Sequence, residues 1–274
     1  MKIPDTSTLP KCDKCGEFLT SEPHYCKQKR CFFTIADNNN MKYYEMMRNS
    51  LQKFHPDIPL ILIDEEKIKQ LGDPHFFYRA TPIVAKGLFK DYDVICKLDA
   101  DQLITGSLDH IWEGDFDVAV VKNSNPREDK AYPIRLMDIH PLSYANCGFV
   151  VMKSKAFVEQ WLKLCYSDHF LNFQYREQDL LNIMIFYMGE KFGGQYKIKF
   201  LDDEDSFHGL ASKGYWPNVQ LRGKDLVLPP IDGYPDKEKI IKVLHWAGGH
   251  SPDKMKYRLN FKQEVCKRLD ELVK

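Results

Sequence analysis

The chain has 274 residues, 43% of them hydrophobic and 28% charged, and its 39 basic side chains balance 39 acidic ones. That length can bury the core of one large or two small domains, and the hydrophobic fraction excludes a mainly disordered protein. A net charge of zero provides no field for nonspecific binding to nucleic acid, which argues against a nucleic-acid partner.

Residues 1–31 form a predicted N-terminal segment in which four cysteines lie among polar and lysine-rich neighbours. Cys12 and Cys15 stand in a Cys-x-x-Cys-Gly sequence, which is typical of a zinc knuckle because the glycine permits a tight turn. With Cys26 and Cys31 they predict a structural Zn²⁺ site, in which His24 could replace either of the latter two. The alternative is a set of free surface thiols. The remaining cysteines have apolar neighbours and are expected in the core: Cys96, Cys147, Cys165 and Cys266.

Residues 32–256 alternate strand and helix patterns. Apolar β-branched and aromatic runs predict strands at 31–36, 59–63, 94–98, 117–121 and 148–152. Apolar residues spaced by three and four predict helices at 41–51, 82–92, 157–165 and 177–187. This order predicts an α/β domain with a mainly parallel sheet flanked by helices on both faces. Residues 123–143 contain three prolines and no period, and we expect them to form a mobile loop over a site.

Acidic side chains follow two of the predicted strands, at the edge of the sheet where α/β proteins bind ligands. The first strand ends at Asp37, which three asparagines follow, and the third ends at Asp99 and Asp101. A DxD motif at such a turn can hold one Mg²⁺ or Mn²⁺ and leave ligand positions open for phosphate oxygens. The alternative is a pair of solvated or turn-capping carboxylates.

Five sequence motifs, in the same order, resemble family 8 glycosyltransferases, the GT-A fold enzymes that include glycogenin and bacterial lipopolysaccharide galactosyltransferases. The motifs are Thr34 to Asn40, Val94 to Trp112, Tyr144 to Met152, Glu177 to Asn182 and Val243 to Gly248. The resemblance covers roughly residues 31 to 255 and leaves the cysteine segment outside. It implies a GT-A fold and a metal-dependent hexosyltransferase that uses a nucleotide diphosphate sugar, a UDP-sugar, with retention at the anomeric carbon.

The resemblance also implies roles for individual residues. Mn²⁺, or Mg²⁺, would be bound by Asp99, Asp101 and His245. The nucleotide would contact Ile35, Asp37, Asn39 and Ala100. The donor sugar and its phosphates would contact Arg79, Lys86, Asn146, Gly248 and Lys254. Gln178 and Glu177 would be catalytic, with Gln178 hydrogen-bonding near the anomeric carbon.

The chain departs from the family pattern at two positions. Glu177 replaces an aspartate, which leaves the donor sugar open, and Ser251 replaces a lysine, which leaves the phosphate contact open. The acceptor could be a carbohydrate, a glycolipid or a protein.

Residues 257–274 predict an amphipathic C-terminal helix, which packs on the sheet or, alternatively, docks peripherally on a membrane. The longest apolar run, Leu180 to Met188, is too short to cross a bilayer, and Met1 to Pro10 lacks a signal-peptide core. We therefore expect a cytoplasmic protein.

Two other functions fit parts of the sequence. One is an inactive GT-A domain that serves as a zinc-knuckle-linked binding module, against which the intact DxD motif and His245 argue. The other is a sugar-1-phosphate nucleotidyltransferase, which would need a glycine-rich loop after the first strand, where Asp37 and three asparagines stand.

Overall fold

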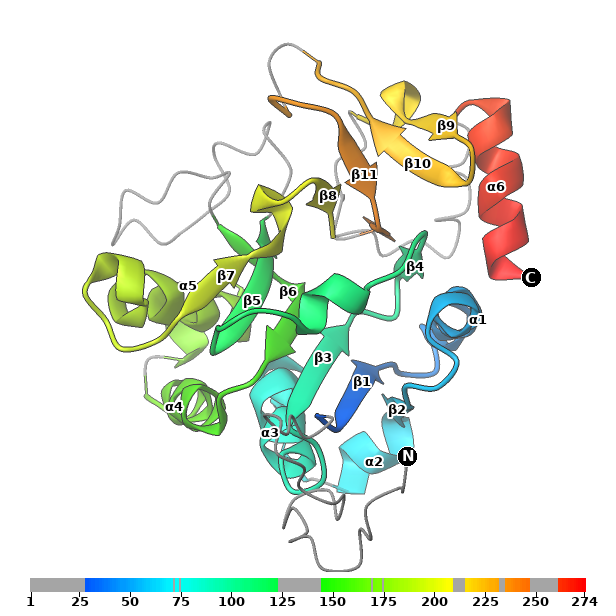
Figure 1. Cartoon of the computed structure of the whole chain (residues 1–274). Coiled ribbons are helices and arrows are strands. Elements are labelled where there is room, and N and C mark those ends of the chain that lie inside the picture. Colours follow the sequence, from blue (N-terminus) through cyan, green and yellow to red (C-terminus); the bar gives the residue numbers. More distant parts are fainter. Residues whose placement is uncertain are drawn as a thin grey trace, which may run out of the picture.

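A computed structural model describes residues 28–122, 144–208, 215–246 and 261–274, except positions 71, 74, 169, 174 and 232–234. Its centre is a six-stranded sheet in the order β2-β1-β3-β6-β5-β7 (Figure 1). The strands are β1 (Arg30–Ile35), β2 (Leu60–Ile63), β3 (Val94–Leu98), β5 (Val118–Lys122), β6 (Ala145–Met152) and β7 (Ile198–Phe200). Three of the five pairings are parallel, and β6 runs antiparallel to both β3 and β5. The expected α/β fold with a mainly parallel sheet is confirmed.

Helices cover both faces of this sheet. One face packs against α3 (Ala80–Leu88), α4 (Lys155–Cys165) and α5 (Glu177–Met188), and the other against α1 (Met41–Phe54). Side chains alternate along each strand, so Phe33 and Ile95 enter the first core while Phe32 and Cys96 enter the second. Burial on both faces explains why the strands read as continuous apolar runs.

Short helical segments complete the domain. The remaining α-helix of this part is α2 (Glu65–Gln70), and the 3-10 turns are η2 (Phe76–Tyr78), η3 (Asp109–Trp112), η5 (Phe170–Asn172), η6 (Glu190–Phe192), η7 (Leu201–Asp203) and η8 (Trp216–Asn218). Within the described ranges, no helix is both long and apolar enough to span a membrane.

A second sheet lies beside the first and was not predicted from the sequence. It has the order β8-β11-β10-β9 and consists of β8 (Ser206–Phe207), β11 (Lys239–Ile241), β10 (Asp225–Leu228) and β9 (Gln220–Arg222). Helix α6 (Gln263–Val273) buries Val265, Leu269 and Leu272 against this sheet (Figure 1). The apolar stripe of the C-terminal helix is therefore covered by the protein's own core, as the packing alternative expected.

A two-stranded ribbon joins the two sheets. After β11 the chain passes Lys242 and enters β12 (Val243–His245), which pairs antiparallel with β4 (Gln102–Ile104). This ribbon brings His245, at the end of β12, to the turn that follows β3.

The structure corrects the prediction that Cys31 binds zinc. Cys31 lies inside β1, which begins before the predicted boundary at residue 31, and its side chain is fully buried in the apolar core. Burial raises the pKa of the Cys31 thiol to about 12, as expected for a cysteine packed among apolar side chains. The other predicted zinc residues lie outside the described residues: Cys12, Cys15, His24 and Cys26. The expected core cysteines are buried or, for Cys266, half-buried.

Candidate active site

The turn after β3 presents the two carboxylates of the DxD motif. All five residues of β3 are buried, so the chain reaches the sheet edge only at Asp99. The Asp99 backbone N–H donates to the Gly148 carbonyl of β6 at 2.8 Å, and the Gln102 N–H donates to the Asp99 carbonyl at 3.2 Å. These bonds fix the backbone of the turn, so both carboxylates start from defined positions.

His245 reaches this turn through the β4–β12 ribbon. The pairing places His245 opposite Gln102, and the N–H of Trp246 donates to the Asp101 carbonyl at 3.1 Å. The imidazole is only 2% exposed. Backbone pairing therefore explains why a residue so distant in sequence joins the DxD turn.

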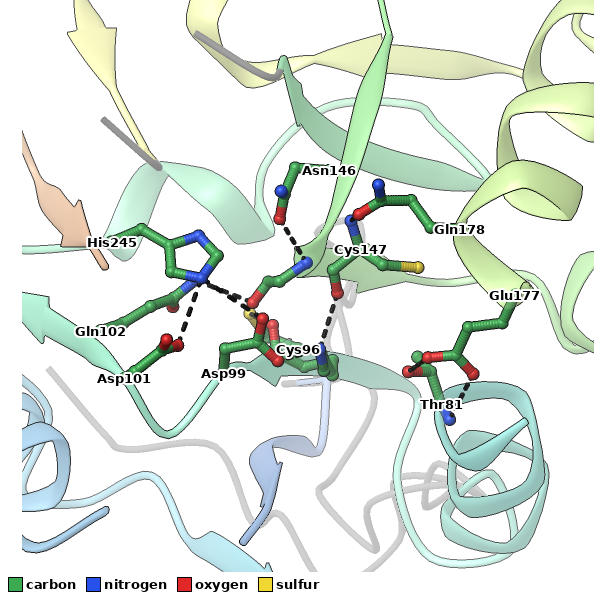
Figure 2. A network of polar contacts seen from close by, with 12 residues as sticks. Thr81, Cys96, Asp99, Asp101, Gln102, Asn146, Cys147, Glu177, Gln178 and His245 are labelled. Carbon is green, nitrogen blue, oxygen red and sulfur yellow. Dashed lines mark hydrogen bonds and ion pairs between the residues drawn. The ribbon is translucent and has the colours of Figure 1, made fainter. Parts of the chain in front are cut away.

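The three side chains converge on one point (Figure 2). His245 Nε2 lies 3.3 Å from Asp99 Oδ2 and 3.3 Å from Asp101 Oδ1. The three candidate ligand atoms all lie within 4.8 Å of one another, and in the described part of the chain no other set of three acidic, cysteine or histidine side chains comes so close. Carboxylate oxygens with one imidazole form a donor set that suits Mn²⁺.

Gly148 allows the side chains of His245 and Asp99 to approach the backbone of β6 closely. A Cβ atom at this position would lie 2.3 Å from His245 Cε1, 2.6 Å from Asp99 Oδ2 and 2.7 Å from Asn146 Oδ1. Any side chain at position 148 would displace His245, Asp99 and Asn146. The donor set and this cradle together fit a divalent ion.

A buried lysine, Lys97 of β3, balances part of the negative charge. Its Nζ forms an ion pair with Asp99 Oδ1 and donates to the Cys147 carbonyl at 2.8 Å. Burial would raise the pKa of Asp99, but Lys97 and His245 outweigh burial and hold it well below its usual range. Burial alone would lower the pKa of His245, whereas Asp101 and Asp99 raise it to about 9. A divalent ion would have to displace the proton that these carboxylates stabilise on the imidazole.

Two amide side chains border the cluster at an irregular part of β6. The pairing of β5 with β6 shifts register between Val120 and Val121, next to Asn146. Asn146 Oδ1 accepts from the Gly148 N–H at 2.6 Å, and Gln178 Oε1 accepts from the Cys147 N–H at 2.9 Å. Side chains therefore occupy these two backbone donors and hold both amides near the carboxylates (Figure 2).

The side chain of Glu177 points away from Asp99, Asp101 and His245 and toward α3. Its carboxylate accepts from the Thr81 N–H at 3.1 Å and from the Thr81 Oγ1–H at 2.7 Å, at the start of α3. In Figure 2 it turns toward Thr81, on the far side of Asp99 from His245. Burial raises the pKa of Glu177 to about 7, against the opposing effects of Lys97 and Thr81. The structure thus separates Glu177 from the converging ligands, although Gln178 stays beside them.

The predicted nucleotide residues lie at the ends of β1 and β3, which are adjacent and parallel. Asp37 Oδ1 accepts from the N–H of Asn40 at 3.0 Å and from its side-chain amide at 2.7 Å, forming the turn before α1. Asn39 is exposed and Ala100 is buried, while Ile35 ends β1. The topology brings these four positions to the same sheet edge as the DxD turn.

Among the described residues, those predicted to contact the donor phosphates do not lie together at the DxD turn. Arg79 pairs with Asp73 at 3.3 Å, and its guanidinium lies 4.7 Å from the ring centre of Tyr166. Lys86 is exposed on α3. Neither has a contact with the DxD turn among the interactions of the described residues. Gly248, Lys254 and the predicted loop 123–143 lie outside the described residues.

Sequence reasoning did not single out Lys97 and Gly148 as site residues. A lysine within the apolar run Val94 to Leu98 was the available signal for the first, since lysine is rarely buried without a partner. For the second, the signal was a glycine inside a strand, which often marks a close approach of other groups.

The proteins to which this chain is similar are glycosyltransferases. No protein-family model matches the chain. Two proteins named lipopolysaccharide 1,2-glucosyltransferase, from Escherichia coli and from Escherichia coli strain K12, are each 26% identical to it over 195 and 171 residues. The alignments cover 63% and 56% of this chain but 56% and 48% of those proteins. The chain thus matches about half the length of these relatives.

Solved structures establish the fold. The galactosyltransferase LgtC, in complex with donor and acceptor sugar analogues, superposes with a TM-score of 0.55 at 18% identity, over 88% of this chain and 94% of LgtC. The bifunctional glycosyltransferase WbbM superposes with a TM-score of 0.51 at 15% identity, over 90% of this chain and 52% of WbbM. The chain has the GT-A-like α/β fold of these proteins.

Proposed function

We propose that the protein is a metal-dependent hexosyltransferase that transfers a sugar from a UDP-sugar to a carbohydrate acceptor. The observation that carries this proposal is the convergence of Asp99, Asp101 and His245 at the carboxyl edge of a GT-A-like sheet. The edge also carries Asp37 and Asn39, whose side chains offer hydrogen-bond partners for a base. The names of the relatives support the same class of reaction.

The metal site would be formed by Asp99 and Asp101 through carboxylate oxygens and by His245 through Nε2. Bound there, Mn²⁺ or Mg²⁺ supplies positive charge that stabilises the departing diphosphate. The protein contributes a rigid setting, because backbone bonds fix the DxD turn and Gly148 lets Asp99 and His245 pack directly against β6. A preorganised site avoids reorganisation during the reaction.

Glycosyl transfer breaks the bond between the anomeric carbon and the β-phosphate oxygen, and it leaves positive character on the sugar. Gln178 is the group we assign beside the reacting carbon. A side-chain amide can hydrogen-bond to the reacting groups but is a weak base and a weak nucleophile. Gln178 therefore suits stabilisation of the transition state better than covalent attack on the anomeric carbon. Gln178 is held by its bond to Cys147, so its position depends on β6 and α5 together.

Glu177 has a positioning role in this proposal. Its two bonds to Thr81 join the first turn of α5 to the first turn of α3. Because Gln178 follows directly, this link fixes where the Gln178 side chain begins. Loss of the link should change catalysis through Gln178 and should leave metal binding intact.

The acceptor we propose is a sugar of a lipopolysaccharide or a related glycolipid, following the names of the relatives. The donor is proposed as UDP-glucose or UDP-galactose, since a glucosyltransferase and a galactosyltransferase are both among the similar proteins.

The test is a panel of UDP-sugars with Mn²⁺, in which released UDP is measured for the wild type and Asp101→Asn. We expect metal-dependent release from one or two donors, reduced at least 100-fold by the substitution, since it removes one ligand charge. Asp115→Asn is the matched control because Asp115 is exposed and pairs with Lys197 at the opposite edge of the sheet. Equal release by wild type and Asp101→Asn, or release of pyrophosphate from a nucleoside triphosphate instead, would refute the proposal.

A further inference from the structure

Arg176, the residue directly before α5, has a backbone conformation that side chains rarely adopt. Its φ is 49° and its ψ is −117°, and every other described residue with a positive φ is a glycine. A Cβ atom makes this region costly, so a non-glycine residue persists there only where its surroundings hold it. Arginine also suits an N-cap poorly, because it offers no acceptor to the helix N–H groups and adds charge to the positive end of the helix dipole. The reason for an arginine should therefore lie in its contacts.

The guanidinium of Arg176 closes the turn that precedes α5. Its Nη1 donates to the carbonyls of Leu171 and Phe173, and its Cζ lies 5.7 Å from the ring centre of Tyr78 in η2. The side chain therefore ties the start of α5 to η5 and η2 and keeps the strained conformation in place.

The conformation of Arg176 sets the direction in which α5 begins. The Leu180 N–H donates to the Arg176 carbonyl at 3.2 Å, and the Gln178 N–H donates to the Tyr175 carbonyl at 3.0 Å. From this first turn, Gln178 Oε1 reaches the Cys147 N–H of β6 at 2.9 Å (Figure 2). A rotation about the Arg176 backbone would therefore carry the Gln178 amide away from β6.

The rest of α5 is anchored to β6 by other side chains. The Tyr144 hydroxyl donates to Asp179 at 2.5 Å, and Asn182 bonds to the N–H and the carbonyl of Ala145 at 2.7 and 2.9 Å. These buried bonds fix the helix independently of Arg176. Loss of the Arg176 contacts should therefore disturb the first turn and leave the fold intact.

We propose that Arg176 is a positioning residue for Gln178, whose guanidinium holds a strained turn in the conformation that directs the Gln178 amide to β6. The inference rests on the proposed function for the place of Gln178 beside the reacting carbon. Because Arg176 acts through Gln178, its loss should lower kcat and leave binding of the donor and of Mn²⁺ unchanged.

The test compares three substitutions in the full chain, with released UDP as the readout of activity. Arg176→Ala loses the guanidinium and keeps the strain, and we expect kcat to fall about 10- to 100-fold while KM for the donor stays within about twofold. Arg176→Gly should be equally slow but should melt about 2–4 °C higher than Arg176→Ala, because it relieves the strain. Arg176→Lys can still donate to the two carbonyls and should retain most of kcat. The matched control is Arg222→Ala in β9, where Arg222 pairs with Glu238 at 2.8 Å, and it should leave kcat and KM unchanged.

Hydrogen exchange tests the position of Gln178 without a reaction. Gln178 Oε1 protects the Cys147 N–H, so Arg176→Ala should speed exchange at Cys147 by about tenfold or more, toward the rate in Gln178→Ala. The Gly148 N–H, which donates to Asn146 Oδ1, should keep its wild-type rate.

Wild-type kcat in both Arg176→Ala and Arg176→Gly would overturn the inference, as would wild-type exchange at Cys147 in folded Arg176→Ala. A loss of Mn²⁺ affinity as large as the loss of kcat would also overturn it, since it would show a general disturbance of the site. The two proposals fail separately. A chain that releases no UDP from any donor but exchanges faster at Cys147 in Arg176→Ala contradicts the transfer reaction and supports the role of Arg176.

Discussion

The substitution Gly148→Ala should damage the metal site through one added methyl group. The new Cβ would lie 2.3 Å from His245 Cε1 and 2.6 Å from Asp99 Oδ2, well inside the closest approach of ordinary carbon contacts. The backbone at Gly148 is held in place, because its carbonyl accepts hydrogen bonds from the Asp99 N–H and from the Gln102 side-chain amide. The imidazole and the carboxylate must therefore move, by roughly 1 Å to restore normal contacts.

Overpacking of this kind costs about 1–3 kcal/mol of unfolding free energy. A displacement of about 1 Å within a functional site commonly costs about 100-fold in activity. We therefore expect Gly148→Ala to lower the melting temperature by several degrees and to weaken Mn²⁺ binding at least tenfold, measured by thermal unfolding in chelator and by calorimetry.

The matched control is Gly87→Ala on α3, where an added Cβ meets nothing within 4 Å. It should leave Mn²⁺ binding unchanged and raise stability slightly, by about 0.5–1 kcal/mol, since alanine favours a helix over glycine. Wild-type Mn²⁺ affinity in Gly148→Ala would refute the reasoning that this glycine is required for space beside the ligands.

Three further predictions concern polar groups that are buried or half-buried. Burial, and then the facing His208, lowers the pKa of His110 to about 4, so the unfolded chain takes up a proton before the folded chain does as pH falls below about 6.5. Stability should therefore fall toward pH 4, by about 1–2 kcal/mol once the partial exposure of the ring is allowed for. His110→Phe should flatten this slope in urea titrations, and an unchanged slope would contradict the reasoning. Tyr144→Phe removes a buried hydrogen bond of 2.5 Å from the Tyr144 hydroxyl to the Asp179 carboxylate. It should lower the free energy of unfolding by about 1.5–3 kcal/mol and leave Mn²⁺ affinity unchanged. An unchanged free energy of unfolding would contradict this reasoning and show that Asp179 finds another hydrogen-bond donor. Burial raises the pKa of Glu177 to about 7, so the folded chain holds a proton that the unfolded chain releases, and wild-type stability should fall between pH 5 and 8. Relative to the wild type, Glu177→Gln should gain about 2–3 kcal/mol over that range, and a constant difference would contradict the raised pKa.

The long strands and helices were predictable because local pattern dictates them. The run Val94 to Leu98 coincides with β3, and the three- and four-residue spacing after Met41 coincides with the start of α1. The second sheet was missed because its strands are two to four residues long, too short for a period to appear, and because their burial depends on packing with α6.

The site was predictable only in part. Residue type and motif order indicated Asp99, Asp101 and His245, and the ribbon of β4 and β12 places them together; their role as metal ligands stays a prediction. Cys31 was misassigned because a strand that begins at Arg30 takes it into the core, and side-chain alternation along that strand overrides its spacing from the other cysteines.

The direction of the Glu177 side chain could not be predicted from the sequence either. Its partner is Thr81, on a helix almost a hundred positions earlier, and nothing local to Glu177 reveals that contact. Lys97 likewise acquires its meaning only when β6 brings the Cys147 carbonyl to it.

The central claim is that one divalent ion is shared by Asp99, Asp101 and His245. Crystals grown with Mn²⁺ and UDP, measured near the manganese absorption edge, test it directly through anomalous scattering. The account predicts a strong anomalous peak between the two carboxylates and His245 Nε2, in contact with the diphosphate. A peak at another place, or UDP bound with no manganese beside these three side chains, would contradict it.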